Sequence, residues 1–211
     1  MNDSNFYTIG LSGLAGAGKD LFYSLLSEEM EIERFALADQ LKSELRPRIF
    51  HETGVDVLDC SHGEKNSVRG LLVEYAKEKR EGSNGRHWIR KLNLKMLPLQ
   101  QSACITDIRY DDYDRDEVYW LKHELGGLLV HISKYQLINN NKKLFFEAPN
   151  EEERRNDPKL KAKSDYIVEW PALESHTEDA RERLKPYASK FAKWLRREAS
   201  ERRIISEPSQ G

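Results

Sequence analysis

The sequence predicts an α/β fold in three layers, with helices covering both faces of a parallel sheet. Short apolar runs alternate along the chain with segments whose apolar residues recur at helical spacing, which is the pattern of βαβ units. A glycine-rich turn directly follows the first apolar run, and a later apolar run ends at an acidic residue. Ligands of parallel sheets bind beyond the carboxyl ends of the strands, so both features indicate a site at that edge.

Length and composition fit one soluble domain over residues 1–205. The chain has 211 residues, of which 38% are hydrophobic and 33% charged, and its net charge is −2. This balance gives no overall basic field for nucleic acid or an anionic membrane. Cys60 and Cys104 lack the spacing of a disulfide framework or a zinc site, which favours a reducing cytoplasmic setting. We expect neither secretion nor a membrane span, because no long apolar run is present.

The N-terminal segment predicts two strands and two helices. Residues 6–11 (FYTIGL) are apolar and partly β-branched, as in a strand, and apolar residues at helical spacing follow the glycine-rich turn. Residues 32–37 (IERFAL) predict a second strand. A helix is expected over residues 38–49, with Pro47 ending or kinking it, because proline lacks the N–H that a helix interior needs.

The middle of the chain predicts further helices and strands. One helix is expected from about residue 67 and another over residues 86–97, each with apolar residues on one face. Residues 102–110 (SACITDIRY) contain a short apolar strand that stops at an acidic residue. Residues 117–125 are expected to be helical up to a Gly-Gly pair, and residues 128–133 (LLVHIS) to form a strand.

The C-terminal part contains a charged insertion. Residues 134–163 are polar and offer little core material, so we expect a mobile, lid-like segment. Residues 165–170 (DYIVEW) predict another strand. A charged helix is expected over residues 178–203, interrupted by Pro186, and residues 206–211 are expected to form a flexible tail.

The strongest signal for function is GLAGAGKD at positions 13–20, which matches G-x-x-x-x-G-K between a predicted strand and a predicted helix. Such glycines let consecutive backbone N–H groups converge on phosphate oxygens, the helix N-terminus adds its positive dipole end, and the lysine reaches the β and γ phosphates. The residues expected to bind the phosphates of ATP are Gly13, Ala15, Gly16, Ala17, Gly18, Lys19 and Asp20. The alternative is a flexible turn that happens to contain a lysine.

Asp20 stands where this motif usually has Ser or Thr to bind Mg²⁺ through a hydroxyl. Its carboxylate is expected to bind the ion directly or through water, while the metal or Lys19 offsets its charge beside the phosphates. The alternative is a degenerate site.

With the motifs that follow, the chain resembles the deoxynucleoside monophosphate kinases of bacteriophages and their bacterial relatives, a branch of the P-loop kinases in which GKD is usual. The matching segments are FALADQLK at 35–42, VRGLL at 68–72, the W-hydrophobic-x-x-L segment from Trp88, TDIRY at 106–110, and Glu117 followed by LGGLLVHI. The resemblance covers residues 9–133. It implies the P-loop kinase fold, ATP and Mg²⁺ as cofactors, and a helical acceptor-binding region over about residues 40–100.

Two departures from the family concern the acceptor. Val73 stands where the family tends to have Gln, and Ala76 where it tends to have Gly, so we expect the choice of nucleotide to differ. The matching segments also imply that Lys42 and Trp88 belong to the acceptor site, with packing as the favoured alternative for Trp88.

Asp107 and Arg109 follow a predicted strand. An acidic residue there is expected to hold the water shell of Mg²⁺, and Arg109, two residues later, to contact phosphate in a catalytic role. A surface ion pair between the two residues is the alternative.

Three more charged residues are candidates for the acceptor side. Asp39 follows the second predicted strand, where it could orient the acceptor or assist proton removal, or cap the following helix. Arg69 and Arg80 flank a predicted helix in the region where related kinases bind the acceptor monophosphate, and a guanidinium suits phosphate geometry. Arg80 equally suits a solvated helix charge.

The charged insertion supplies cations for a lid. A lid that closes over ATP needs positive charge to neutralise the transferred phosphoryl oxygens, and Arg155 is our catalytic candidate. The other cations of this segment are Arg154, Lys159 and Lys161. A solvated surface with no such role is the alternative.

These residues predict an enzyme that transfers the γ-phosphoryl group of ATP to a nucleoside monophosphate, with a deoxynucleotide as the favoured acceptor. Two rivals remain: a P-loop kinase for another small phosphorylated acceptor, such as phosphomevalonate or dephospho-coenzyme A, and a nucleotide-binding module without transfer activity. As partners we expect small-molecule nucleotides, but neither nucleic acid nor a membrane; a homodimer is compatible with the sequence.

Overall fold

The computed structural model describes residues 6–96, 100–138, 141–173 and 178–206. In chain order the elements are β1 (Thr8–Ser12), α1 (Lys19–Glu29), β2 (Glu33–Phe35), α2 (Leu37–Thr53), α3 (His62–Glu81), α4 (Arg86–Met96), β3 (Ala103–Ile105), α5 (Glu117–Tyr119), the π-helical turn η1 (Trp120–Glu124), β4 (Leu128–Ile138), β5 (Lys142–Phe145), α6 (Glu151–Ala162), β6 (Tyr166–Pro171) and α7 (Glu178–Ser206). The predicted tail lies outside the described residues from position 207 onward.

The sheet confirms the predicted fold class. Its parallel strands lie in the order β2-β3-β1-β4-β6, and β5 adds an antiparallel partner to the far half of β4. After β1 the chain forms β2 and then β3, and β3 lies between β1 and β2 in the sheet. The next strand, β4, lies on the opposite side of β1. The strand order therefore reverses at β1, and ligands of such sheets bind at this point, beyond the carboxyl ends of the strands.

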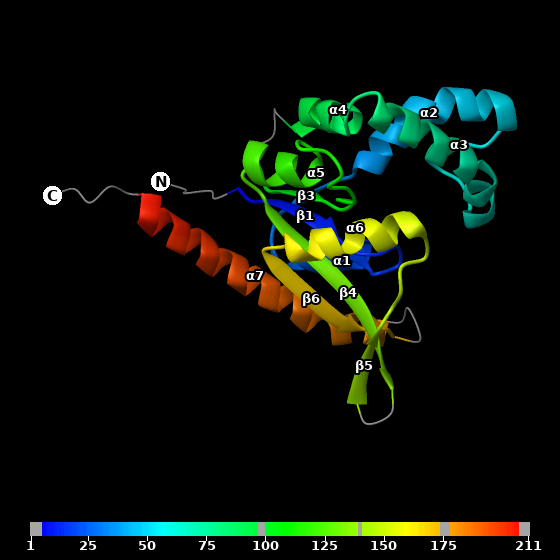
Figure 1. Ribbon diagram of the computed structural model, residues 1–211. Coiled ribbons are helices and arrows are strands. Elements are labelled where there is room, and N and C mark those ends of the chain that lie inside the picture. Colours follow the sequence, from blue (N-terminus) through cyan, green and yellow to red (C-terminus); the bar gives the residue numbers. More distant parts are fainter. Residues whose placement is uncertain (1–5, 97–99, 139–140, 174–177, 207–211) are drawn as a thin grey trace.

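Helices cover both faces of this sheet, because successive strand residues point to opposite sides. Val130 of β4 packs in the core cluster that also contains Phe22 of α1 and Phe191 of α7. Its neighbour Leu129 packs in the second cluster, on the other face, with residues of α4, η1 and α6. Figure 1 shows α6 and α7 on opposite sides of β4 and β6. The result is a three-layer α/β/α arrangement.

Helices α2, α3 and α4 lie together at one side of the sheet (Figure 1). Residues of α2 and α3 form a small third core cluster, whereas α4 packs in the second cluster. Helix α3 begins at His62, five residues before the predicted start, because Ser61 and Glu64 form a capping box. Helix α2 runs through Pro47, which the sequence analysis expected to end or kink it. Pro47 lies on the exposed side of the helix, where water can hydrate the carbonyl that loses its N–H partner.

The segment at 134–163 is more regular than predicted. Strand β4 continues to Ile138, β5 pairs with its far half, and α6 follows. Leu160 of α6 is 3% exposed and anchors this helix in the second core cluster. Near the C-terminus, α7 likewise passes through the predicted interruption at Pro186, which lies on its exposed side.

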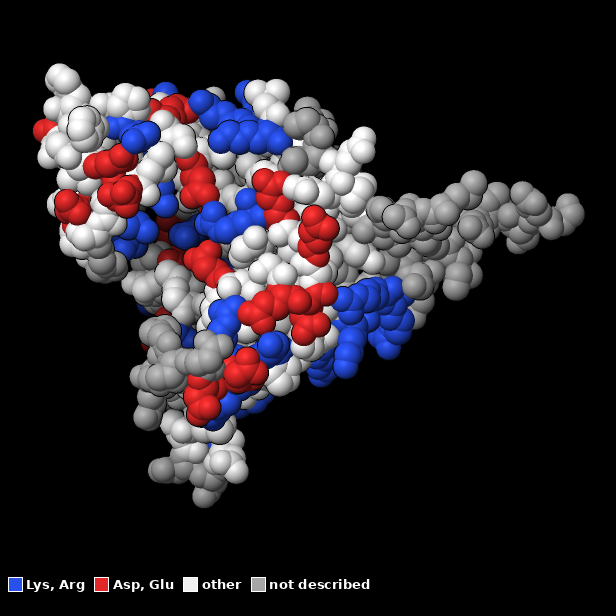
Figure 2. Space-filling view, turned by 180° about the vertical axis from the view of Figure 1, so that it is seen from behind, with Lys and Arg blue, Asp and Glu red and all other residues white. Residues whose placement is uncertain are grey.

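Acidic and basic side chains are interspersed over much of the surface on the side opposite to the view of Figure 1, and Lys and Arg gather along α7 (Figure 2). Part of this charge is paired with α1, because Arg181 and Lys185 both form ion pairs with Glu28. Among the described residues, no helix is both long and apolar enough to cross a membrane.

Candidate active site

The glycine-rich loop, residues 13–20, connects β1 to α1 at the point where the strand order reverses. Gly13, Gly16 and Gly18 have φ values of 124°, 77° and 95°, which L side chains rarely adopt. At two of these positions there is also no space for a side chain: a Cβ would lie 2.2 Å from the Ile132 carbonyl oxygen at Gly13 and 2.5 Å from the Trp170 ring at Gly18. The motif therefore contains glycine where this backbone path requires it.

Lys19 begins α1 and bends back across the loop. Its Nζ donates hydrogen bonds to the carbonyl oxygens of Gly13, at 2.7 Å, and Leu14, at 2.9 Å. The residue is 9% exposed. Burial lowers the pKa of Lys19 to about 8, and the nearby positive charge of Arg109 adds to this shift. A negatively charged ligand in the loop would favour the protonated lysine.

A carboxylate from α6 already contacts this loop. Glu153 Oε2 accepts a hydrogen bond from the backbone N–H of Ala15, with 2.6 Å between the two atoms. Asn150 caps α6 by accepting from the backbone N–H of Glu153, and its Nδ2 donates to Glu153 Oε1 at 3.0 Å. The loop thus uses one of its N–H groups to hold an anionic group, as expected for a nest of backbone donors.

Asp107 lies two residues beyond β3, beside the loop. Its Oδ1 and Oδ2 accept hydrogen bonds from the backbone N–H groups of Leu37 and Ala38, both at 2.8 Å. Burial raises the pKa of Asp107, while these hydrogen bonds and Arg109 act in the opposite direction. The carboxylate therefore caps the N-terminus of α2 from another strand. A role in metal binding stays a prediction.

Arg109 is an exposed cation four residues beyond the carboxyl end of β3. Its side chain forms no ion pair with any other residue that the structure describes, and its charge reaches Lys19 strongly enough to lower the pKa of the lysine. The backbone N–H of Arg109 donates to Glu117 Oε2 at 2.6 Å. An exposed guanidinium is thus carried by a firmly held backbone beside the glycine-rich loop.

Asp20 and Asp39 meet at Arg34, a β2 residue that the sequence analysis did not single out. Arg34 Nη1 donates to Asp39 Oδ2 at 2.8 Å, and Arg34 Nε lies 3.7 Å from Asp20 Oδ1. Lys42 lies 3.7 Å from the other oxygen of Asp39. Asp39 lies in the first turn of α2 and is not its N-cap residue, which is Ala36. The helix-cap alternative for Asp39 is therefore wrong, and its substrate role stays a prediction.

Three of the side chains proposed for the acceptor site, Arg69, Arg80 and Trp88, differ in how far they are exposed to solvent. Arg69 is exposed on α3. Arg80, at the other end of α3, has a side chain only 9% exposed, and it is enclosed by Asp116 and Glu117. A solvated helix charge is therefore wrong for Arg80, and a direct substrate contact would require these ion pairs to open. Trp88 is 5% exposed and packs in the second core cluster, as its packing alternative suggested.

The cations of α6 pair with acidic residues outside the glycine-rich loop. Arg155 Nη2 lies 3.3 Å from Asp112 Oδ2, and Lys159 Nζ lies 3.1 Å from Asp112 Oδ1. Arg154 pairs with Glu151 in its own helix, and Lys161 lies 3.7 Å from Glu169. In this arrangement Glu153 of α6 contacts the loop through the backbone N–H of Ala15.

A buried histidine fastens α6 to the sheet. His131 is 1% exposed; its Nε2 lies 3.0 Å from Asp157 Oδ1 and its Nδ1 lies 3.2 Å from Ser133 Oγ. The sequence shows no triad-like spacing among its histidines, and a hydrogen bond between side chains of two distant elements leaves no local signal. Because the ring is shielded from solvent, we interpret this chain of contacts as a structural fastening of α6.

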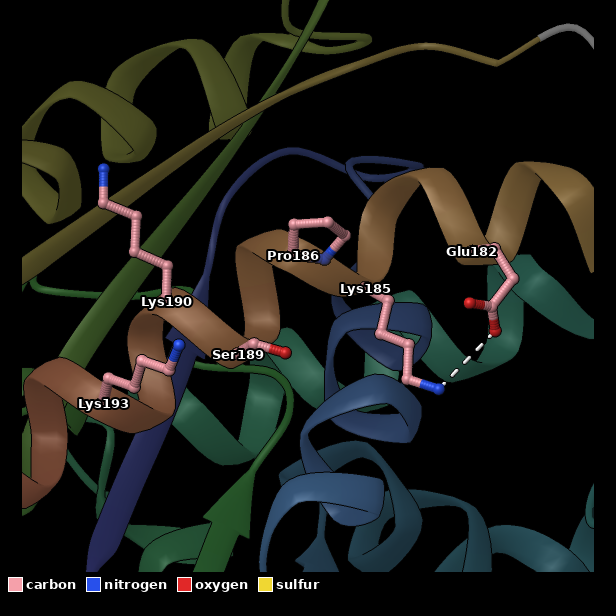
Figure 3. A pocket seen from close by; sticks show the side chains of 6 residues that line it. All are labelled: Glu182, Lys185, Pro186, Ser189, Lys190 and Lys193. Atoms are coloured by element: carbon pink, nitrogen blue, oxygen red, sulfur yellow. Dashed lines mark ion pairs between the residues drawn. The ribbon is translucent and has the colours of Figure 1, made fainter.

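A shallow hollow lies on α7, and none of its lining residues belongs to the glycine-rich loop (Figure 3). It is lined by Glu182, Lys185, Pro186, Ser189, Lys190 and Lys193. The part of the chain that the structure describes holds no group of three or more His, Cys, Asp or Glu side chains arranged to bind a metal ion.

Comparisons with known proteins give remote likenesses. No family model matches the sequence, and neither does any curated protein. A shikimate kinase from Bacteroides thetaiotaomicron is 12% identical with a TM-score of 0.47, and the match covers 90% of this chain and 98% of that one. A dephospho-CoA kinase from Campylobacter jejuni is 12% identical with a TM-score of 0.44, covering 89% and 96%. A shikimate kinase from Acinetobacter baumannii in complex with shikimate is 16% identical with a TM-score of 0.43, covering 91% and 94%. Likenesses this remote say nothing about substrate or activity.

Proposed function

We propose that this chain is a kinase that transfers the γ-phosphoryl group of ATP to a nucleoside monophosphate, with a deoxynucleotide as the favoured acceptor. The observation that carries the proposal is the glycine-rich loop with Lys19 folded across it, at the strand-order reversal of a parallel sheet. Backbone N–H groups, a helix N-terminus and a buried ammonium together suit a chain of phosphates. The nucleoside monophosphate as acceptor rests on the ordered resemblance of residues 9–133.

The proposed reaction needs positioning more than covalent chemistry. An oxygen of the acceptor phosphate attacks the γ-phosphorus of ATP, the bond to the β,γ-bridging oxygen breaks, and that oxygen leaves with its electron pair as part of ADP. Lys19 would stabilise the charge on the β and γ phosphates. Arg109, exposed and beside the loop, would approach the transferred group from the β3 side.

Mg²⁺ bound with ATP takes most of its ligands from phosphate and water, so one or two protein carboxylates suffice. Asp20 fits such a role, because its side chain is 82% exposed directly after Lys19. Asp107 accepts one backbone N–H hydrogen bond on each oxygen, and the remaining lone pair of each oxygen would be the one available to Mg²⁺ or its water. The ion would neutralise phosphate charge during transfer.

On the acceptor side we assign Arg69 as the contact to the monophosphate. It is the exposed arginine of α3 within the segment that resembles the family's acceptor helix. Asp39 and Lys42, at the start of α2, would orient the acceptor from the neighbouring helix. Arg80 is not part of this contact, because its guanidinium is enclosed.

Helix α6 would act as the lid, and its Glu153 must leave Ala15 before a phosphate can take the same N–H group. Arg155 and Lys159 would then exchange Asp112 for phosphate oxygens when the lid closes over ATP.

The proposal is tested by measuring ADP release from ATP with a panel of acceptors. The panel contains the four deoxynucleoside monophosphates, their ribose counterparts, shikimate, dephospho-coenzyme A and phosphomevalonate. Turnover with a nucleoside monophosphate is expected. Turnover confined to one of the last three acceptors would establish a different small-molecule kinase, and ATP binding without turnover would indicate a nucleotide-binding module.

A further inference from the structure

We propose that Arg80 and Glu117 are positioning residues for the proposed phosphoryl transfer: together they fix the backbone that presents Arg109 to the glycine-rich loop. This inference rests on the proposed function. It assigns a role to a buried cluster of ionisable side chains in which two carboxyl groups enclose a guanidinium.

The cluster consists of one guanidinium and two carboxylates. Arg80 Nη1 donates to Glu117 Oε1 at 3.1 Å and to Asp116 Oδ1 at 3.2 Å, and its Nη2 donates to Asp116 Oδ2 at 2.8 Å. The guanidinium carbon lies 3.7 Å from the centroid of the Tyr110 ring. Side-chain exposure is 9% for Arg80, 4% for Glu117 and 0% for Asp116.

The second oxygen of Glu117 reaches the segment after β3. Glu117 Oε2 accepts hydrogen bonds from the backbone N–H groups of Arg109, at 2.6 Å, and Tyr110, at 3.0 Å. Asp116 Oδ2 accepts from the backbone N–H of Asp112 at 3.0 Å. Residues 109–112 are thus held at both ends by the two carboxylates that Arg80 holds together.

The segment at 109–112 also meets the lid and the loop. Asp112 pairs with Arg155 and Lys159 of α6, while the charge of Arg109 reaches Lys19. The Arg109 side chain forms no ion pair with another described residue, so its place depends on the backbone that carries it. A guanidinium that must meet a phosphate oxygen within a few tenths of an ångström benefits from a fixed starting point.

Burying a guanidinium with two carboxyl groups does not by itself stabilise a fold, because replacing a buried ion pair by apolar residues of similar volume is often neutral or stabilising. A carboxyl group can connect a side chain to the backbone, which apolar packing cannot do. Glu117 accepts from Arg80 with one oxygen and from the backbone N–H groups of Arg109 and Tyr110 with the other. Substitution by Gln keeps the shape but places an amide NH₂ group against one of these donors.

A double-mutant cycle distinguishes positioning from general stabilisation. The variants are Glu117→Gln, Arg109→Ala and the pair together, with kcat, KM and thermal unfolding measured for each. We expect Arg109→Ala to lower kcat roughly a hundredfold and Glu117→Gln roughly tenfold. In the Arg109→Ala background, Glu117→Gln should change kcat less than about twofold.

Glu124→Gln is the matched control. Glu124 belongs to the neighbouring turn η1 and pairs with Arg86 and Arg115, but it is not bonded to residues 109–112. The kcat of Glu124→Gln should stay within about twofold of the parent value. If Glu117→Gln does not fold, Arg80→Lys takes its place in the cycle, because lysine keeps the charge but cannot hold both carboxylates in the same geometry.

An equal effect of Glu117→Gln in both backgrounds would overturn the proposal, since a structural role acts whether or not Arg109 is present. If the parent turns over no acceptor, the proposed function is wrong. The same four proteins are then compared by their dissociation constants for ATP. A loss of affinity that disappears in the Arg109→Ala background would still support positioning; an additive loss would overturn it.

Discussion

Glu153 Oε2 lies 2.6 Å from the backbone nitrogen of Ala15, so a carboxylate of α6 uses an N–H group of the loop proposed to bind phosphate. An anion of the chain and an anion of the ligand compete for the same donor.

Glu153→Ala is therefore expected to tighten ATP binding. If the contact contributes about 1 kcal/mol net, its loss should lower the dissociation constant of ATP roughly fivefold. Isothermal titration calorimetry measures the change. Glu151→Ala is the control, because Glu151 lies in the same helical turn with a side chain that is 82% exposed and pairs only with Arg154 among the contacts described above. Equal affinities in the parent and both variants would contradict the competition.

Lys19→Ala should abolish phosphoryl transfer and leave the fold intact. The sequence analysis expects this lysine to reach the phosphates of ATP, and the structure buries its side chain, with Nζ on two carbonyl oxygens of the loop itself. Its loss therefore removes the charge facing the phosphates and loosens the loop. We expect turnover to fall at least a hundredfold or so, with circular dichroism unchanged. Turnover within tenfold of the parent would contradict the assignment of the loop.

ATP affinity should weaken as the pH rises above about 8, where the free protein loses the Lys19 proton. Phosphate favours the charged lysine, so binding at high pH must take up a proton, and affinity should fall by up to roughly tenfold per pH unit. Calorimetry in buffers of different ionisation enthalpy measures this uptake: little at pH 7 and close to one proton near pH 9.5.

Lys19→Arg is the control for this pH dependence, because arginine stays charged throughout the range. A decline of equal slope in this variant would assign the effect to another group.

Arg69→Ala should raise the KM of the monophosphate without changing ATP affinity measured in its absence. A charge-assisted contact to phosphate contributes about 1.5–3 kcal/mol, which corresponds to roughly a ten- to hundredfold rise in KM. Lys77→Ala on the same helix serves as control, since its described partner is Glu81. Equal losses for ATP and acceptor would identify Arg69 as a structural residue.

The fold was predictable because local signals agreed with the tertiary structure. Glycine at positions 13, 16 and 18 indicated the loop, because the backbone there has positive φ values. The strands beside the loop are buried, and their short apolar runs are visible in the sequence. The start of α3 was also readable: Ser61 and Glu64 are spaced as a capping box, a signal that our prediction overlooked.

Neither Pro47 nor Pro186 ends its helix, and the position of each on the helix gives a physical reason. A proline inside a helix leaves the carbonyl four residues earlier without its N–H partner. Both Pro47 and Pro186 lie on exposed helix sides, where water can hydrate that carbonyl. The position of a proline in the sequence does not by itself show whether it will lie on the exposed or the buried side of a helix.

The buried charges of the site were the least predictable part. Arg80 reads as a helix charge in the sequence, because its partners Asp116 and Glu117 come 36 and 37 residues later. His131 and Asp157 likewise lie on different elements. Asp107 was expected at the strand end, but its use of both oxygens to cap α2 depends on how β3 lies beside β2.

The most direct test follows the transferred group itself. The protein is incubated with ATP labelled with ³²P at the γ position and each of the four deoxynucleoside monophosphates, and the products are separated by chromatography. The proposed kinase should place the label in a nucleoside diphosphate, with little in inorganic phosphate, and Lys19→Ala should leave it in ATP. Label found only in inorganic phosphate, or retained in ATP with all four acceptors, would contradict deoxynucleoside monophosphate kinase activity.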